Sequence, residues 1–533
     1  MFFFPNKRAP MIVELAACTA ALAVLKFYLT GRKNAHMPYW DPPQGEGPYH
    51  AILSMRENIK NNVKMHAYPM LNWLGLVKID IHWINDPKTA REVFLKNDSA
   101  YGHLDMKGWF DLNSEYRYRT KKHIKWETCN ADETGMLRDF KRSDPEGSKI
   151  GKLCRKRVME VLAKKSLEPV WMEAIEREIP GMVRRIKEEG KNGAVPFYPF
   201  DNVTMPAAMS VLLGVSFNID CSTQESWIRT MINYSCKALH TLTRLDGHKL
   251  FLVLLPRWVR NLIPISLWPK WTGELQGFTT EIIELIETHN KNWQVGDDSS
   301  SLIAPLETDR QKGLCTYWDI VHTLQAMILA GADTTATSTA SCMRQLAMNP
   351  PVQQKLYDLL AAQDFRADSF TDCHYLMAVM YESYRMCPMV WRSLFHVVTE
   401  DMTIEDYKFS KDDFLAYSHT GVCFSERYFP DPYKFKPERF LDENGEFKKN
   451  ENLMPFFIGK RSCPGQILAN LEVFHFMKNL IKEFRFEVSP DAPIDTTFTE
   501  KGWHTLWSHG AHKEWNHHFL MPAENRILCI PRH

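Results

Sequence analysis

The stretch "FFIGKRSCPGQILA" (residues 456–469) places a single cysteine just before a segment rich in helix-forming residues. Backbone N–H groups at a helix start, together with the nearby Arg461, favour the thiolate form of Cys463. Gly459 and Gly465 allow the backbone to approach a large, flat group closely. A lone thiolate on such a loop suits one axial bond to a haem iron, and the alternative is a buried structural cysteine.

The composition is that of a large globular protein. The chain has 533 residues, of which 44% are hydrophobic, and no low-complexity linker or repeat divides it after residue 50. Its 65 basic and 64 acidic residues give a net charge of +1, so no nucleic-acid partner is expected. The 12 cysteines include no Cys-x-x-Cys pair, which argues against a zinc ribbon or a redox dithiol of that type. Reduced thiols in a cytosol-facing protein are the simplest interpretation.

The N-terminus contains a candidate membrane anchor. Residues 11–29 form a largely apolar run, close to the roughly 20 residues that cross a bilayer as a helix. A removable signal peptide is the alternative, but no small-residue cleavage site precedes the basic residues Arg32 and Lys33. These basic residues favour a cytosolic main body. We therefore predict a retained single-pass anchor in residues 1–36 and a stiff Pro-rich connector in residues 37–50.

A long helix is predicted in the middle of the chain. Thr316 and Asp319 form a capping-box pattern, and apolar residues then recur until a pair of prolines ends the pattern. The helix over residues 317–348 would be about 48 Å long. Its centre, "AGADTT" (residues 330–335), suits a buried helix interior poorly, because threonine hydroxyls bond back to the preceding turn. Two interpretations are open: a kink in a core helix, or a groove in which polar groups face a ligand.

Two shorter motifs lie between this helix and the Cys463 loop. Glu382 and Arg385 are spaced i, i+3 on a predicted helix and therefore share one face. Taken alone, they are equally consistent with an exposed ion pair of little energetic value. Arg439 follows in "FKPERFL", a stretch without helical periodicity.

Together these motifs resemble those of the cytochrome P-450 family, in the family's order. All defining positions of its haem-binding signature are matched, by Phe456, Gly459, Arg461, Cys463 and Gly465. The centre of the long helix resembles the family's oxygen-activation motif, the Glu–Arg pair resembles its ExxR motif, and "PERF" matches the motif that follows. With the anchor and the connector, the resemblance covers essentially the whole chain and is to the microsomal, membrane-anchored type.

The resemblance implies a mainly α fold, a helical triangular prism with a small β-rich region, preceded by one transmembrane helix. Residues 51–533 would form one catalytic domain. The implied location is the endoplasmic reticulum membrane, with the catalytic domain in the cytosol and in contact with membrane lipid. Implied partners are an NADPH–cytochrome reductase, cytochrome b5 as a further electron donor, and a lipophilic small-molecule substrate.

The resemblance also assigns roles to single residues around haem b. Cys463 would be the axial ligand of the iron, and its electron release would favour O–O cleavage. Ala330 and Gly331 would lie over the opposite face, with Gly331 leaving room for oxygen. Thr334 and Asp333 would hold and relay the protons that oxygen activation needs.

Charged residues complete the implied site. The buried structural network of the family would consist of Glu382, Arg385 and Arg439. Arg461 and His396 match the positions that bind the haem propionates. Arg155 matches the arginine of the family's Trp-x-x-x-Arg motif, but Gly151 stands where that motif has its tryptophan.

Three function classes follow from these observations. The first is a membrane-anchored monooxygenase that takes electrons from a flavoprotein reductase. The second is an oxygen-independent haem-thiolate isomerase or dehydratase, and the third is a haem-binding sensor without catalysis. The intact pair of Asp333 and Thr334 favours the first, because the second class does not need an acid and an alcohol over the haem.

Overall fold

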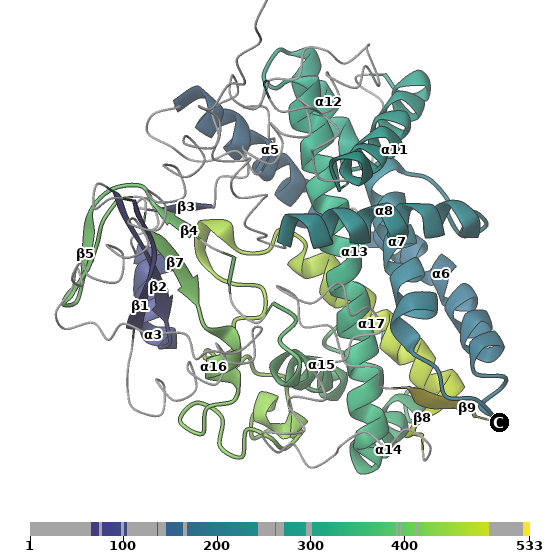
Figure 1. Cartoon of the computed structure of the whole chain (residues 1–533). Coiled ribbons are helices and arrows are strands. Elements are labelled where there is room, and N and C mark those ends of the chain that lie inside the picture. The colour runs from purple at the N-terminus through teal and green to yellow at the C-terminus, as the bar shows by residue number, and fades with distance from the viewer. Residues whose placement is uncertain are drawn as a thin grey trace, which may run out of the picture. The chain divides into compact units, whose positions relative to one another are not determined.

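A computed structural model describes much of the chain (Figure 1). The described residues are 65–73, 77–96, 101–103, 136, 145–163, 168–243, 262, 271–294, 301–390, 393–394, 396–411, 413–489 and 526–532. They belong to two compact units, Met1–Leu104 with Arg392–Ser425 and Asp105–Trp391 with Glu426–His533. The predicted anchor and connector lie outside the described residues.

The second unit is mainly helical, as the sequence predicts. Its α-helices are α5 (Pro145–Ala163), α6 (Glu168–Glu189), α7 (Met205–Phe217), α8 (Glu225–Thr243), α11 (Trp271–Asn292), α12 (Ile303–Gln311), α13 (Tyr317–Met348), α14 (Pro350–Ala361), α15 (His374–Met386) and α17 (Gln466–Glu483). Its shorter elements are η5 (Phe200–Thr204), η7 (Pro437–Phe440), η8 (Gly459–Arg461), β8 (Phe484–Val488) and β9 (Ile527–Pro531). In Figure 1, α13 runs through the middle of this unit, and it contacts α17.

Helix α13 forms over the predicted span and begins at the predicted cap. The Thr316 hydroxyl accepts the backbone N–H of Asp319 at 3.2 Å, and the Asp319 carboxylate accepts the backbone N–H of Thr316 at 3.1 Å. This reciprocal pairing satisfies donors that a helix start otherwise leaves open. The helix ends at Asn349, and Pro350 starts α14. The structure is α-helical from end to end of α13, across residues 330–335 as well.

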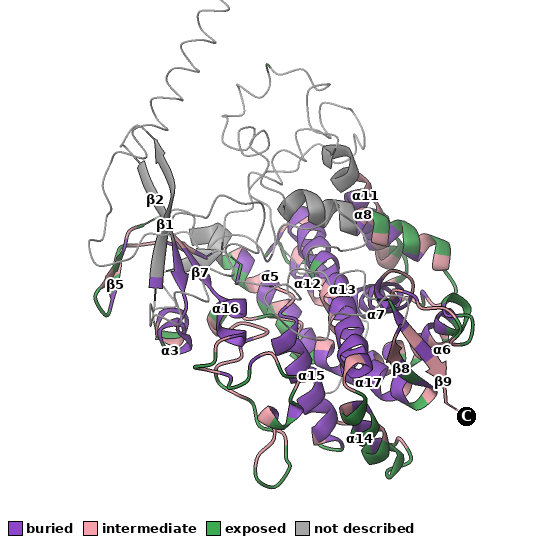
Figure 2. Ribbon diagram, turned by 60° about the horizontal axis from the view of Figure 1, so that its bottom comes forward, coloured by how far each residue is buried: buried purple, intermediate pink, exposed green. Residues whose placement is uncertain are grey.

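Helix α13 is also the centre of the hydrophobic core of its unit. It contacts α5, η5, α7, α8, α11, α12, α14, α15, α17 and β8. Figure 2 shows it almost entirely in the colour of buried residues. A helix surrounded in this way must be apolar on most sides, which explains why its sequence lacks one clean polar face.

The first unit is built on a five-stranded sheet with the order β1-β2-β7-β4-β3. Its elements are β1 (Met65–Trp73), β2 (Val77–Ile84), α3 (Pro87–Arg91), η1 (Glu92–Lys96), β3 (Tyr101–His103), β4 (His396–Val398), β5 (Met402–Ile404), β6 (Tyr407–Phe409), β7 (Phe414–Tyr417) and α16 (His419–Cys423). The pair β2–β7 is parallel, whereas the other pairs of this sheet are antiparallel. The buried His82 Nε2 lies 3.0 Å from Asp413 Oδ2 and ties β2 to the residue before β7. Strands from distant parts of the chain thus meet in the small β-rich region that the sequence predicts.

One helical stretch among the described residues is long and apolar enough to cross a bilayer. It is Phe200–Phe217, which comprises η5 and α7, and 83% of it is buried inside the protein. Packing in the core of the second unit therefore accounts for its composition. The anchor predicted in residues 11–29 lies outside the described residues and stays a prediction.

Candidate functional site

The accessible part of α13 is confined to one stripe at its centre. Ala330 is exposed, and Gly331, Thr334 and Ser338 are half-buried, whereas the rest of the helix is buried except at its two ends. Residues at this spacing lie along one side of an α-helix. A core helix that is accessible only along this stripe can face a ligand there. Of the two interpretations of this segment, the groove is therefore the better supported.

Thr334 lies on this stripe, whereas Asp333, the residue before it, is buried. The Thr334 hydroxyl donates to the carbonyl oxygen of Ala330 at 2.7 Å, as back-bonding in a helix predicts. Asp333 is 2% exposed, and neither of its carboxyl oxygens has a hydrogen-bond partner among the described residues. Burial disfavours the charged form and raises the pKa of Asp333 to about 7. The carboxyl group thus carries a proton below neutral pH, next to a hydroxyl on the open stripe.

The raised pKa of Asp333 predicts a pH-dependent stability. Between its unfolded pKa, about 3.9, and its folded pKa, about 7, the folded protein binds the extra proton. The free energy of unfolding should therefore fall as the pH rises through this window, by up to about 4 kcal/mol in total. Asp333→Asn should remove this fall, as measured by urea unfolding between pH 5 and pH 8. Asp364→Asn, at a carboxylate that is 79% exposed, should keep it. Identical pH profiles for wild type and Asp333→Asn would contradict a protonated Asp333.

Gly331 has a packing reason for lacking a side chain. A Cβ atom at this position would lie 2.7 Å from Cδ2 of Leu212 on α7. Real Cβ atoms do not approach other carbons so closely, so a larger residue at position 331 would require the Leu212 side chain to shift. The role that the resemblance gives Gly331, leaving room for oxygen over the haem, stays a prediction.

The Cys463 loop presents its sulfur outward. Cys463 is exposed, whereas the other cysteines among the described residues are buried, and none of them is in a disulfide. The backbone N–H of Cys463 donates to the carbonyl oxygen of Phe456 at 2.8 Å and closes the loop. Gly459 has a φ of +79°, a conformation that favours glycine. A Cβ atom added to Gly465 would meet no heavy atom of a described residue within 4 Å. The loop therefore has one open face beside an accessible sulfur.

The cation that acts on Cys463 is Arg155 of α5. Its buried guanidinium donates from Nε to the carbonyl oxygen of Lys460 at 3.1 Å and from Nη2 to the carbonyl oxygen of Ser462. Cys463 is exposed, but the protein atoms around its thiol still desolvate the thiol and raise its pKa, whereas the backbone N–H of Gly465 and the charge of Arg155 lower it. The sequence pattern predicts Arg461 in this electrostatic role. Arg155 instead holds the two carbonyl groups that flank Arg461, directly before the cysteine.

Glu382 and Arg385 form a buried ion pair, so the exposed alternative is wrong. Both side chains are fully buried, and Arg385 donates from Nε to Oε2 of Glu382 at 2.8 Å and from Nη2 to Oε1 at 2.7 Å. Arg439 of η7 donates to Oε1 of Glu382 at 3.3 Å, and the backbone N–H of Lys436 donates to the same oxygen at 2.8 Å. The predicted three-residue network is therefore present in the structure. Bidentate pairing with further donors is the geometry that makes such a buried pair tolerable.

The same two arginines bind backbone carbonyl groups of the segment before η7. Arg385 donates to the carbonyl oxygens of Pro432 at 2.7 Å and Lys434 at 3.2 Å, and Arg439 donates to that of Asp431 at 2.7 Å. The network thus fixes this segment against α15.

Helix α15 also reaches the Cys463 loop and α17. The ring of its Tyr384 meets that of Phe456 edge-on, with centroids 5.8 Å apart. The Tyr384 hydroxyl donates to Oδ1 of Asn470 on α17 at 3.2 Å. The charge network and the cysteine loop are therefore connected through one helix.

The two remaining predicted residues lie in different units. Arg461 is buried in η8, and His396 lies in β4 of the first unit, where its ring centroid is 5.0 Å from that of Phe94. Their joint role at the haem propionates stays a prediction.

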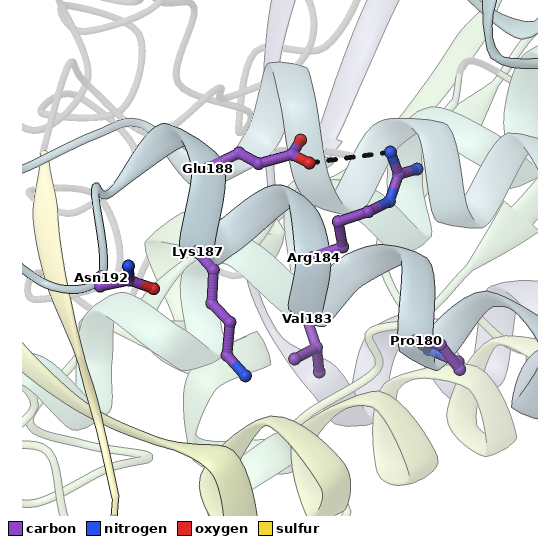
Figure 3. A pocket seen from close by; sticks show the side chains of 6 residues that line it. All are labelled: Pro180, Val183, Arg184, Lys187, Glu188 and Asn192. Carbon is purple, nitrogen blue, oxygen red and sulfur yellow. Dashed lines mark ion pairs between the residues drawn. The ribbon is translucent and has the colours of Figure 1, made fainter.

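The structure also has a hollow on the surface of α6 (Figure 3). It is lined by Pro180, Val183, Arg184, Lys187, Glu188 and Asn192. Arg184 and Glu188 approach to 3.8 Å, and both side chains are more than half exposed. An exposed pair of this kind contributes little energy, and none of the predicted site residues lines the hollow.

The chain's own residues fit a haem between the Cys463 loop and α13. The loop offers an accessible sulfur and open space beside Gly465. Helix α13 offers its open stripe at Ala330 and Thr334, and it contacts α17, which follows the loop in the same unit. A flat macrocycle held through one thiolate requires this combination of donor and space.

Comparisons with known proteins agree with this geometry. The family model "Cytochrome P450" matches residues 146–509, which is more than half of the chain. Cytochrome P450 2J2 of Homo sapiens is 28% identical over 353 residues, which cover 63% of this chain and 66% of that protein. Cytochrome P450 2U1 of Bos taurus is 27% identical over 349 residues, which cover 63% of this chain and 62% of that protein. Cytochrome P450 2E1 of Oryctolagus cuniculus is 31% identical over 228 residues, which cover 41% of this chain and 46% of that protein.

In each of these comparisons the chain spans less than two thirds of the relative's length. The match to the family model nevertheless includes the central helix, the buried charge network and the cysteine loop. The chain therefore belongs to the cytochrome P450 family, and its cofactor is a haem whose iron is bound by a cysteine thiolate.

Proposed function

We propose that the protein is a monooxygenase that inserts one oxygen atom from O2 into a lipophilic small molecule. Its electrons would come from NADPH through a flavoprotein reductase, with cytochrome b5 as a further donor. The observation that carries this proposal is the pair at the open stripe of α13: a buried Asp333 with a pKa of about 7 beside the accessible Thr334 hydroxyl. An acid that is half protonated near pH 7 can give up a proton and regain it at that pH.

Each polar group of the site has a distinct part in this proposal. Cys463 is the iron ligand, and haem supplies the reduction of oxygen when it is bound. Arg155 positions the cysteine loop through the carbonyl groups of Lys460 and Ser462. The Thr334 hydroxyl presents a proton at the open stripe, and Asp333 holds the proton that replaces it. Glu382, Arg385 and Arg439 keep the scaffold beneath the loop in place.

Thr334→Ala tests this function directly. The variant should bind haem and substrate as wild type does, and NADPH oxidation should continue, because the iron ligand and the reductase are unchanged. Product formed per NADPH should fall and hydrogen peroxide should rise, since the hydroxyl that presents the proton is missing. Asp333→Asn should instead slow turnover itself, on the order of 10²-fold for the loss of a positioned acid. Both are measured in reconstituted assays with the reductase.

Thr339→Ala is the matched control for Thr334→Ala. Its hydroxyl also bonds back one turn, to the carbonyl oxygen of Thr335 at 3.0 Å, but it is fully buried and off the open stripe. This variant should keep the wild-type ratio of product to NADPH. Conversion of substrate without NADPH, reductase or O2, unchanged in both site variants, would overturn the monooxygenase and favour the isomerase class.

We extend the proposal to the placement of the protein in the cell. Residues 1–36 would hold it in the endoplasmic reticulum membrane as a single-pass anchor, residues 37–50 would be the connector, and residues 51–533 would form the cytosolic catalytic domain. The apolar run of residues 11–29 and the basic residues that follow it support this arrangement.

A further inference from the structure

Tyr384 of α15 contacts both chain segments that flank the Cys463 loop. Its ring meets that of Phe456, seven residues before the cysteine, edge-on with centroids 5.8 Å apart. Its hydroxyl donates to Oδ1 of Asn470, seven residues after the cysteine, at 3.2 Å. Tyr384 and Asn470 are both buried. One side chain thus holds the two ends of the segment that carries Cys463.

Each of these contacts reaches the cysteine through the backbone. The carbonyl oxygen of Phe456 accepts the backbone N–H of Cys463 at 2.8 Å, so a displacement of Phe456 also displaces the cysteine. Asn470 lies in the second turn of α17, which begins at Gln466, three residues after Cys463. Because a short stretch of helix moves as a rigid unit, the position of Asn470 determines where the loop ends. Both contacts of Tyr384 therefore bear on the position of the sulfur.

Other aromatic rings fix Tyr384 in turn. Its ring centroid lies 5.4 Å from that of Tyr381, one helical turn before it. Tyr381 packs against Phe440 and Phe447, with centroids 6.0 Å and 4.8 Å away. Aromatic pairs at such distances stabilise a structure beyond the area that they bury. The buried charge network also fixes α15 against the segment before η7. Tyr384 thus presents its ring and its hydroxyl from a rigid support.

We propose that Tyr384 is a positioning residue that keeps the Cys463 sulfur in the geometry in which it binds iron. Arg155 holds the carbonyl groups of Lys460 and Ser462 just before the cysteine, whereas Tyr384 holds the two ends of the loop. A metal ligand keeps its orientation only if the groups behind it are fixed, and losing such a partner typically costs about 10–100-fold in metal affinity or activity. The inference rests on the proposed assignment of Cys463 as the iron ligand.

Tyr384→Phe removes the hydroxyl and keeps the ring. In the full-length, haem-loaded protein, the reduced CO adduct should lose its thiolate Soret band about fivefold faster than in wild type, the factor expected from losing one hydrogen bond of average strength. The rate is followed well below the thermal midpoint, and far-UV circular dichroism checks that the helices stay folded. Haem release to an excess of apomyoglobin should accelerate as well. A wild-type rate of band loss would overturn the proposal.

Tyr375→Phe is the matched control on the same helix. The Tyr375 hydroxyl also donates at 3.2 Å, but to Oε1 of Glu438 on η7, so this variant loses a bond of the same length that does not reach the Cys463 loop. It should lose the thiolate band at the wild-type rate. If it loses the band as fast as Tyr384→Phe does, the effect is a general loosening of α15, and the proposal fails.

A double-mutant cycle with Asn470→Leu tests the hydrogen bond itself. Each single variant leaves one buried polar group without its partner, whereas the double variant replaces both partners by apolar groups. We expect the double variant to lose the thiolate band no faster than the faster of the two single variants. Additive acceleration would mean that Tyr384 and Asn470 act independently, and would overturn the role of the hydroxyl.

Tyr384→Leu tests the ring. It should lose the thiolate band several-fold faster than Tyr384→Phe, because the edge-on contact with Phe456 is lost together with the hydroxyl. If this variant does not fold, Phe456→Leu removes the same contact from the loop side, and a wild-type rate there would overturn the role of the ring. Failure of the ligand assignment gives a different result, since the band would then survive Cys463→Ser.

Discussion

Cys463→Ser should abolish the red-shifted Soret band that the reduced, CO-treated protein gives when a thiolate binds the iron. Serine is nearly the same size as cysteine, but its hydroxyl ionises far less readily and offers no soft anionic donor to iron. The haem content after purification should fall with the band. Because the Cys463 side chain is exposed, unfolding of the haem-free variant should match that of the haem-free wild type within about 0.5 kcal/mol. Loss of ligation can thus be separated from loss of fold.

Two other cysteines serve as controls for this substitution. Cys387 and Cys423 are buried, in the second and the first unit respectively. Cys387→Ser and Cys423→Ser should keep the thiolate band, even if burial of the new hydroxyl lowers their stability. A normal thiolate spectrum in Cys463→Ser, or its loss in one of the two controls with haem still bound, would refute Cys463 as the ligand.

The central helix could be predicted from the sequence because its signals are local. The capping box at Thr316 and Asp319 and the proline after Asn349 define its two ends, and each signal spans only a few residues. The cysteine loop was recognisable for a similar reason, since five motif positions fall within ten residues. The hydrogen bond from the Thr334 hydroxyl to the carbonyl oxygen of Ala330 could be predicted because it lies within a single helical turn. Packing against the rest of the protein does not change short-range features of this kind.

The contacts between distant segments could not be predicted. Arg155 precedes the carbonyl group of Lys460 by 305 positions, and no periodicity in either segment signals that contact. The sequence indicated Arg155 only through an incomplete motif and favoured Arg461, which is nearer in the chain, for the electrostatic role. The close approach of Gly331 on α13 to Leu212 on α7 likewise joins two helices that are far apart in the sequence. Such pairings depend on the packing of whole helices, which residue patterns alone do not determine.

Burial also decided a question that spacing left open. Glu382 and Arg385 share a helix face whether that face is exposed or buried. Removing one partner costs several kcal/mol more if the pair is buried than if it is exposed. The structure places both side chains at 0% exposure and adds Arg439 from a segment more than fifty residues away. Because a buried charge must be paired, the energetic role of this network follows from its burial.

Glu382→Ala should therefore yield apoprotein or aggregate, not a slow but folded enzyme. The substitution leaves the guanidiniums of Arg385 and Arg439 in the interior without the carboxylate that both of them contact. Removing one partner of a buried pair costs about 3–5 kcal/mol, a large part of the roughly 5–15 kcal/mol by which a domain is stable. Arg385→Ala should have a similar effect, because it strands Glu382 and releases the carbonyl groups of Pro432 and Lys434. Haem per chain, soluble yield and thermal midpoint measure the loss.

Glu438→Ala is the matched control, one residue before Arg439 on the same short helix. Its carboxylate pairs with Lys355 at 3.0 Å, but the two side chains are 44% and 50% exposed. Such a pair contributes about 1 kcal/mol or less, so this variant should bind haem and unfold close to wild type. Glu382→Gln tests the charge with nearly the same side-chain shape. Its amide keeps one acceptor oxygen but cannot balance the charges of two arginines. Its haem content and thermal midpoint should therefore be closer to those of Glu382→Ala than to those of wild type. Recovery of Glu382→Ala with full haem and a wild-type thermal midpoint would contradict this role. The segment before η7 would then be held by its own packing, and the Cys463 loop would not depend on the charge network.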